Sequence, residues 1–153
     1  MKLSKAREKA VVLEKIHPDD EALELMYYGW RGMTKRADEY LATVGLSRVH
    51  HRILYSVARG NGLTVTDLIA ILSITKQALH RPLKQLLDKN YVSMERDPER
   101  HRYKILGLTP GGRKVEQRAS ELERLVMGRA FAKAGEQGRR AWLTVMAEAA
   151  REL

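Results

Sequence analysis

The sequence contains no cysteine in its 153 residues, and this absence excludes several classes of protein. Disulfide frameworks, zinc sites with thiolate ligands and thiol-based redox sensors all require cysteine. Long apolar runs are absent as well, since every apolar stretch is far shorter than the roughly 18 residues that indicate a membrane-spanning helix. The basic residues 1–16 are interrupted by Glu8 and Glu14, so no signal peptide is expected. We therefore expect a cytoplasmic protein with no membrane partner.

Arrangements suited to catalysis are missing too. The sequence has no glycine-rich phosphate loop, no nucleophile beside a general base and no cluster of carboxylates. His50 and His51 are adjacent, but successive residues of a helix point about 100° apart and cannot readily share a metal ion. His50 falls on an apolar face and is expected to be buried and hydrogen-bonded, whereas His51 is expected to be exposed. We expect no enzymatic activity, no cofactor and no metal.

Positive charge is in excess, with 28 Lys and Arg against 19 Asp and Glu and a net charge of +9. Residues 75–118 alone carry 11 basic and 5 acidic residues, a net of +6, against +2 for residues 1–74 and +1 for residues 119–153. Such a concentration is typical of a surface that binds a polyanion. A generally basic surface is the alternative, and charge alone does not separate the two.

Helical spacing of apolar residues marks both ends of the chain. It predicts a short helix over residues 3–13, and a long helix that is capped by Asp19 and Asp20 and ends near Val44. Near the other end, Thr109-Pro110 predicts the start of a second long helix. This helix is expected to break at the glycines of residues 135–138 and to be followed by a final helix.

Shorter elements are predicted between the long helices. Helices are expected over residues 47–59, 64–72 and 75–89, and strands over residues 91–96 and 102–108, with Pro98 in the loop that joins the strands. Thr64 and Asp67 have the spacing of a capping box, and Thr75 is a favourable N-cap. The helix over residues 64–72 is expected to be largely buried.

A short helix, a turn, a capped second helix and a basic hairpin are typical of a winged helix-turn-helix. The major groove of B-DNA admits one helix, which the preceding helix braces across the backbone. On the second helix Leu79, Leu83 and Leu86 share one face and can anchor it. Donors for phosphates and purine edges lie elsewhere on this helix: Thr75, Lys76, Gln77, His80, Arg81 and Lys84. A merely solvated helix face is the alternative, which the agreement of cap, turn and hairpin disfavours.

The predicted wing is rich in basic side chains, namely Arg96, Arg100, His101 and Arg102. A narrow minor groove has a strong negative potential that attracts guanidinium groups. Asp97 and Glu99 reduce the positive charge of this loop. We expect Asp97 to hold an arginine by a charge-assisted bond rather than to contact DNA.

Residues 46–112 resemble the MarR family of bacterial transcriptional regulators. The similar segments are LSRVHHRIL before the helix-turn-helix, LIAILSITKQALHR through it, and the wing DPERHR that leads into LTPGG. The resemblance implies an obligate homodimer with interlocked terminal helices and two winged lobes. It also implies recognition helices in successive major grooves, about 34 Å apart, and wings in the flanking minor grooves.

The sequence departs from the family pattern at several positions. Ile69 stands where the family usually has a small residue, and Ser73 where it usually has the turn glycine. In the wing, Arg100 replaces an acid and His101 an arginine, so the arginine that enters the minor groove is left open. Pro82 lies inside the recognition helix and predicts a kink, because it removes a bond to a preceding carbonyl.

The sequence thus predicts a mainly α (α+β) protein. Residues 1–45 are assigned to N-terminal dimerisation helices, residues 46–109 to a winged helix-turn-helix lobe with a two-stranded wing, and residues 110–153 to C-terminal dimerisation helices. The predicted function is that of a homodimeric, sequence-specific repressor that binds a pseudo-palindromic operator in double-stranded DNA. The alternatives are a non-specific nucleic-acid-binding winged protein, and an enzyme or docking module that only uses the fold.

A small aromatic or lipophilic effector is a further expected partner. The resemblance implies a site between the dimerisation helices and the winged lobe, and the candidate residues are Met26, Tyr27, Trp30, Met33 and His50. Packing of the soft side chains in a dimer core is the competing interpretation.

Overall fold

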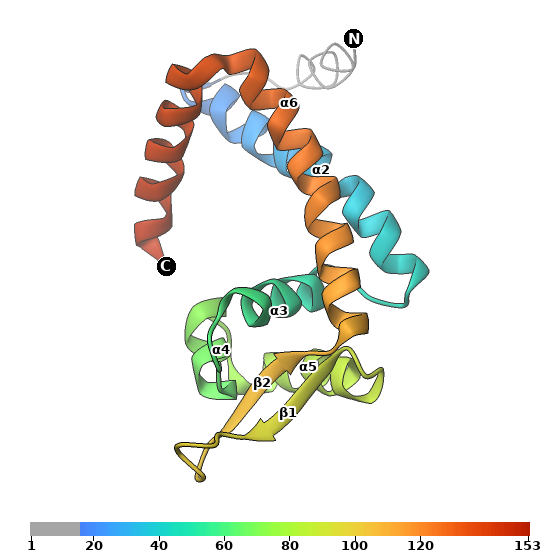
Figure 1. Cartoon of the computed structure of the whole chain (residues 1–153). Helices are drawn as coiled ribbons and strands as arrows, with labels where there is room; N and C mark the ends of the chain where they lie inside the picture. Colours follow the sequence, from blue (N-terminus) through green and yellow to red (C-terminus); the bar gives the residue numbers. More distant parts are fainter. Residues whose placement is uncertain (1–15) are drawn as a thin grey trace. The chain divides into compact units, whose positions relative to one another are not determined.

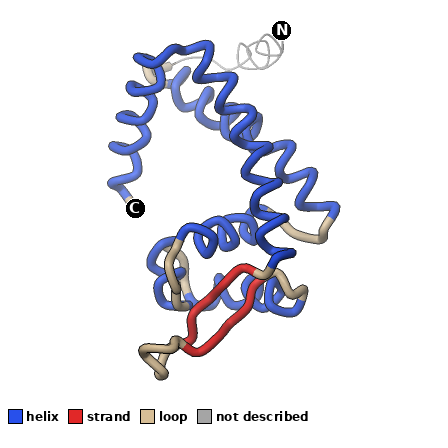
Figure 2. The backbone as a smooth tube through the Cα atoms, viewed as in Figure 1, coloured by secondary structure: helices blue, strands red, loops and turns tan. Residues whose placement is uncertain are grey.

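The computed structural model describes residues 16–153, so the helix predicted over residues 3–13 lies outside the described part. The chain divides into two compact units, Met1–Lys35 and Arg36–Leu153. The described residues are mostly helical, with one antiparallel pair of strands (Figures 1 and 2). The predicted mainly α fold with a two-stranded wing is therefore confirmed.

The first described helix, α2 (Asp20–Thr43), begins and ends where the sequence predicts. The Asp20 carboxylate accepts the backbone N–H groups of Ile16 and His17, each at 2.8 Å, and so holds the chain that enters the helix. Gly45, at φ +69°, ends it in the left-handed region, which glycine adopts without strain. In the second unit Ala37 and Leu41 of this helix are fully buried.

Three helices follow, α3 (Arg48–Arg59), α4 (Val65–Leu72) and α5 (Lys76–Asp88). The capping box at α4 is confirmed: Thr64 Oγ1 accepts the Asp67 N–H at 3.2 Å, and the Asp67 carboxylate accepts the Thr64 N–H at 2.7 Å. Ser73, the C-cap of α4, has φ +51°, which explains why a glycine suits the turn. Thr75 caps α5 by accepting the Ala78 N–H at 3.1 Å.

The wing consists of β1 (Val92–Arg96) and β2 (Lys104–Leu108), which pair antiparallel from Val92 with Leu108 to Arg96 with Lys104. The loop that joins them projects away from α3, α4 and α5 (Figure 1). β2 is also bonded to the loop between α3 and α4, since the Leu106 N–H donates to the Leu63 carbonyl at 2.7 Å.

The last long helix, α6 (Pro110–Ala149), is followed by the short 3-10 helix η1 (Ala150–Glu152). Thr109 caps α6 by accepting the Gly112 N–H at 3.0 Å, as predicted. Gly135 leaves the helical region at φ +73°, which confirms the predicted break. Phe131 and Trp142, on either side of the break, pack edge to face with ring centroids 5.4 Å apart.

The core of the second unit lies where the end of α2, the helices α3, α4 and α5, the wing and the start of α6 meet. Its largest fully buried side chains are Leu41, Ile53, Leu54, Leu68, Leu79 and Leu86. Each contributes about 1.5–3 kcal/mol by leaving water. α4 is less buried than the sequence predicts: Leu68 is its one buried residue, and Ile71 is half exposed.

Large apolar side chains remain exposed on the two long helices. In the first unit they include Leu23, Leu25, Met26, Tyr27 and Trp30 of α2, and in the second Leu125, Trp142, Leu143 and Val145 of α6. None of the helices in residues 16–153 has both the length and the apolar character needed to span a membrane.

Candidate nucleic-acid interface

Helix α5 separates its apolar and polar residues as the sequence predicts. Leu79, Leu83 and Leu86 are buried and hold the helix against the core. The six residues predicted to bind DNA at this helix are all exposed: Thr75, Lys76, Gln77, His80, Arg81 and Lys84. The helix thus presents cationic and amide donors to solvent from a rigidly packed support, which is the geometry that reading a major groove requires.

The second half of α5 has contacts that the sequence analysis did not anticipate. Lys84 Nζ lies 2.6 Å from the Asp88 carboxylate one turn later, so its charge is partly neutralised within the helix. The Gln85 side-chain oxygen lies 2.8 Å from His50 Nε2 of α3. The donors of α5 that extend to solvent without such a contact are therefore concentrated in its first half, at Lys76, Gln77, His80 and Arg81.

Pro82 is buried inside α5. It has no N–H to donate to the carbonyl of Ala78, which lies on the exposed side of the helix. The helix nevertheless continues from Lys76 to Asp88 without a break. A local bend at Pro82 remains a prediction.

The wing loop is organised around Asp97, which is buried although its neighbours are exposed. Its carboxylate accepts the N–H groups of Glu99 at 2.9 Å and Arg100 at 3.1 Å, and the Arg100 Nε at 3.0 Å. The two backbone bonds, followed by the side-chain bond and the charge of Arg100, hold the pKa of Asp97 below its usual range against the opposing effect of burial. The expectation that Asp97 holds an arginine is confirmed, and the arginine is Arg100.

The other three wing residues predicted to bind DNA are exposed: Arg96, His101 and Arg102. Arg100 differs from them, because its guanidinium is bound to Asp97 and lies 5.3 Å from the centroid of the Tyr103 ring. The loop itself is closed by two backbone bonds, from Asp97 N–H to Tyr103 at 2.9 Å and from Tyr103 N–H to Arg100 at 2.8 Å. The wing tip is therefore held in a defined shape.

His50 and His51 have different partners, and both are buried. The expectation for His50 is confirmed: its Nδ1 lies 3.1 Å from the Ser47 backbone nitrogen and its Nε2 reaches Gln85. The expectation that His51 is exposed is wrong, because α3 is covered on this side by α6. Val49 also has helical spacing with the buried Ile53 and Val57, yet it is 41% exposed.

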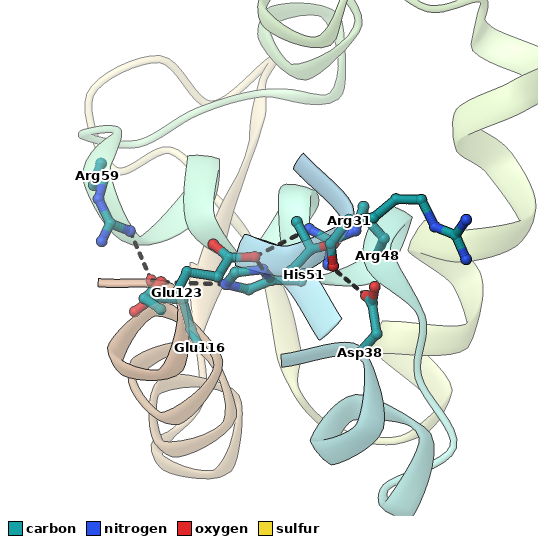
Figure 3. Close-up of polar contacts among 9 residues, drawn as sticks. Arg31, Asp38, Arg48, His51, Arg59, Glu116 and Glu123 are labelled. Carbon is teal, nitrogen blue, oxygen red and sulfur yellow. Dashed lines mark hydrogen bonds and ion pairs between the residues drawn. The ribbon is translucent and has the colours of Figure 1, made fainter. Parts of the chain in front are cut away.

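His51 belongs to a line of polar contacts between α3 and α6 (Figure 3). Its Nε2 lies 3.2 Å from Ser120 Oγ, which donates to Glu116 at 2.6 Å, and Glu116 also accepts from Arg59 at 2.7 Å. On the other side, His51 Nδ1 lies 3.6 Å from Glu123. Arg48 extends the line, since it bonds Glu123 at 3.0 Å and Asp38 at 2.5 Å.

Burial and charge act in opposite directions within this line. Burial lowers the pKa of His51 below its usual value, although Glu123 and Glu116 act to raise it. Burial acts to raise the pKa of Glu116, but the bonds from Ser120 and Arg59 and the charge of Arg59 outweigh it and leave the pKa lowered. A neutral His51 and an ionised Glu116 follow at neutral pH. The polar spacing of Glu116, Ser120 and Glu123 on one side of α6 is the sequence signal that could have revealed these contacts.

Comparison with known proteins agrees with this architecture. Residues 44–102 match a family model described as MarR family. The HTH-type transcriptional regulator PetP of Rhodobacter capsulatus is 37% identical over 117 residues, which cover 76% of this chain and 70% of that protein. The chain belongs to the MarR family. It is thus a MarR-type helix-turn-helix transcriptional regulator, and the family is one of regulators rather than enzymes.

Further relatives extend the similarity to nearly the whole chain. An uncharacterized HTH-type transcriptional regulator, YdgJ of Bacillus subtilis, is 31% identical over 110 residues, 71% of this chain and 66% of that protein. A MarR family regulator from Silicibacter pomeroyi has a crystal structure that covers 92% of this chain and 95% of its own, with a TM-score of 0.71 and 25% identity. The crystal structure of an S. aureus MepR–DNA complex shares the fold, with a TM-score of 0.69 and 19% identity over 84% of this chain and 96% of that one.

Proposed function

We propose that this MarR-family chain binds double-stranded DNA sequence-specifically through the exposed face of α5. The observation that carries the proposal is the separation of residues on α5, with leucines in the core and cationic and amide side chains in solvent. Gln77 and Arg81 stand one turn apart and suit purine edges, since glutamine pairs bidentately with adenine and arginine with guanine. Lys76 suits a phosphate. The structural relative MepR was crystallised with DNA, which supports the proposal.

We further propose that Arg102 is the wing residue that enters the minor groove. Arg100 is bound to Asp97 and to the face of Tyr103, so its use on DNA would break contacts that shape the loop. Arg102 is exposed at the end of the loop. A minor groove attracts such a guanidinium through its negative potential. Arg100 then serves to hold the loop, and Arg96 and His101 are left for the flanking phosphates.

A homodimer is the proposed assembly. Its support is the set of large apolar side chains that α2 and α6 leave exposed in a single chain, among them Trp30 and Trp142. Such side chains on a folded protein mark an interaction surface. Sedimentation at several concentrations should give twice the chain mass, and a monomer at micromolar concentration would contradict this assignment. In the dimer, residues 1–45 and 110–153 supply the interface, residues 46–109 bind DNA, and the proposed place of action is the cytoplasm.

Repression by blocking a promoter, with release by an effector, is the proposed mode of regulation. Met26, Tyr27, Trp30 and Met33 of α2 are the residues proposed to meet an aromatic acid. His50 suits this role less, because Ser47 and Gln85 already occupy both of its ring nitrogens. Calorimetric titration with phenolic acids should show heat and weaken operator binding, and a panel without either effect would remove this part of the proposal.

Binding to the DNA upstream of its own gene tests the proposed function. Fluorescence anisotropy at one fixed salt concentration should show that this duplex binds at least about a thousandfold more tightly than a random duplex. Arg81→Ala should weaken operator binding by about 1–3 kcal/mol and relax the preference at one base pair. Equal affinity for both duplexes would favour a non-specific nucleic-acid-binding protein instead.

A further inference from the structure

A chain of hydrogen bonds joins the start of α3 to the recognition helix. The Ser47 backbone N–H can only donate, and it lies 3.1 Å from His50 Nδ1. Nδ1 must therefore accept, so the neutral ring carries its proton on Nε2. That proton points to the Gln85 side-chain oxygen at 2.8 Å. The bonds run in one direction, from Ser47 through His50 to Gln85.

The ring at the centre of this chain is fixed in place. His50 is only 7% exposed, and both of its nitrogens have partners on different elements. Ser47 Oγ also lies 2.9 Å from Nδ1. Gln85, by contrast, is an exposed residue of α5. A buried, immobile group thus holds a flexible side chain at the edge of the recognition helix.

The place of Gln85 on α5 gives this contact a role that the leucines cannot supply. The buried residues of α5, Leu79, Pro82, Leu83 and Leu86, form one apolar stripe. Apolar packing is non-directional, so it defines the rotation of the helix about its axis less sharply than a directed bond does. Gln85 lies about 100–160° around the helix from these leucines. It stands one turn after Arg81 and two turns after Gln77. A directed bond at Gln85 therefore fixes the angle at which those two side chains leave the helix.

We propose that His50 and Gln85 are positioning residues for DNA recognition, which set the rotation of α5 about its axis through the His50 Nε2–H to Gln85 bond. The inference rests on the proposed function, because it assigns these residues to base selection by Gln77 and Arg81. It gives His50 a task within the DNA-binding lobe itself. It also assigns Gln85 the role of orienting α5 rather than of contacting DNA.

Gln85→Ala tests the proposal, with Gln117→Ala as the matched control, since Gln117 is an exposed glutamine of α6 and not of the proposed DNA-binding surface. The measured quantity is the ratio of affinities for the operator and for a random duplex at one salt concentration. Gln85→Ala should lower this ratio about 3- to 10-fold, the effect of one hydrogen bond, and leave random-duplex affinity unchanged. Gln117→Ala should leave both affinities unchanged.

Gln85→Glu distinguishes positioning from a direct contact with DNA. The carboxylate still accepts the Nε2 proton, so the ratio should stay near that of the unmodified chain. The added negative charge should weaken operator and random duplex by the same factor. A ratio as low as that of Gln85→Ala would overturn the proposal. So would an unchanged ratio in Gln85→Ala.

His50→Phe and an imidazole spectrum complete the test. In a His50→Phe background, Gln85→Ala should have no further effect on the ratio, and an additional loss would overturn the proposal. If His50→Phe does not fold, the Gln85 variants still decide. Long-range ¹H–¹⁵N correlation of the full chain should show a slowly exchanging Nε2 proton on His50 that Gln85→Ala makes fast, and a ring protonated at Nδ1 would contradict the bond. An unmodified chain without operator preference would instead refute the proposed function, and the spectrum would then decide the contact alone.

Discussion

Replacing Glu116 with glutamine tests whether the buried polar line between α3 and α6 stabilises the fold. Glu116 is 4% exposed and accepts hydrogen bonds from Ser120 and Arg59. Glutamine keeps the shape and one acceptor oxygen, but it removes the charge that strengthens both bonds. Its amide group also needs an acceptor in a place built for a carboxylate. The substitution should therefore destabilise the protein.

The size of the effect follows from the two partners. A hydrogen bond to a charged group contributes about 1.5–3 kcal/mol. The bond from the buried Ser120 should contribute an amount near this range. The Arg59 side chain is 39% exposed, so water can replace Glu116 as its partner, and its bond should contribute about 1 kcal/mol or less. The desolvation of the carboxylate opposes both gains. We expect Glu116→Gln to lower the free energy of unfolding by about 2 kcal/mol.

Urea denaturation at neutral pH and one fixed protein concentration measures this change. A loss of about 2 kcal/mol should lower the midpoint by roughly 1 M. Glu121→Gln is the control in the same helix, because Glu121 meets Arg118 at 3.6 Å in an exposed pair. That variant should lose less than about 0.5 kcal/mol. Equal midpoints for the two variants would refute the claim that the contacts of Glu116 between α3 and α6 stabilise the fold.

Three further predictions concern pH, packing and the wing. The pKa of His51 is lower in the folded than in the unfolded chain, so the unfolded chain binds the proton more readily, and stability should be complete above pH about 6.5 and fall as the pH drops towards 5. The pKa of Glu116 is also lowered, and it should add a loss of stability only below the usual glutamate range. An unfolding midpoint that stays constant from pH 7 to 5 would contradict this. Gly112→Ala should lower the free energy of unfolding by about 1–3 kcal/mol or more, since an added Cβ would lie 1.9 Å from the Tyr91 carbonyl oxygen. The control Gly111→Ala, whose Cβ would meet nothing closer than 3.6 Å, should unfold at the same midpoint as the unmodified chain or at a higher one. Asp97→Ala should weaken operator binding about tenfold through loss of the loop shape, as seen by anisotropy, and a variant that binds as the unmodified chain does would show that the wing needs no internal support.

The elements that local rules govern were predictable from the sequence. Thr64, Thr75 and Thr109 each begin a helix as expected, because a cap depends only on residues within one turn. The break at Gly135 and the wing strands follow in the same way. The separation of leucines from polar residues on α5 was also read correctly, since it depends on helical period alone.

The contacts that depend on a second element were not predictable in this way. His51 was expected in solvent because the period of α3 identifies one buried face, but α6 covers another. The contact of Gln85 cannot be predicted from the sequence, because its partner His50 lies 35 residues earlier in the chain. Arg100 and Arg102 were indistinguishable in the sequence, and the loop geometry around Asp97 separates them. Long-range packing, rather than local propensity, decides each of these cases.

The salt dependence of DNA binding tests the central claim, that the exposed face of α5 binds duplex DNA, most directly. For the unmodified chain, the logarithm of the binding constant should fall linearly with the logarithm of the salt concentration on operator and random duplex alike. Lys76→Ala should reduce this slope by about 1 on both duplexes, and Arg81→Ala should weaken the operator selectively. Lys133→Ala, a change at an exposed lysine of α6, should alter neither. If the Lys76 and Arg81 variants bind both duplexes as the unmodified chain does, the face of α5 is not the DNA-binding surface.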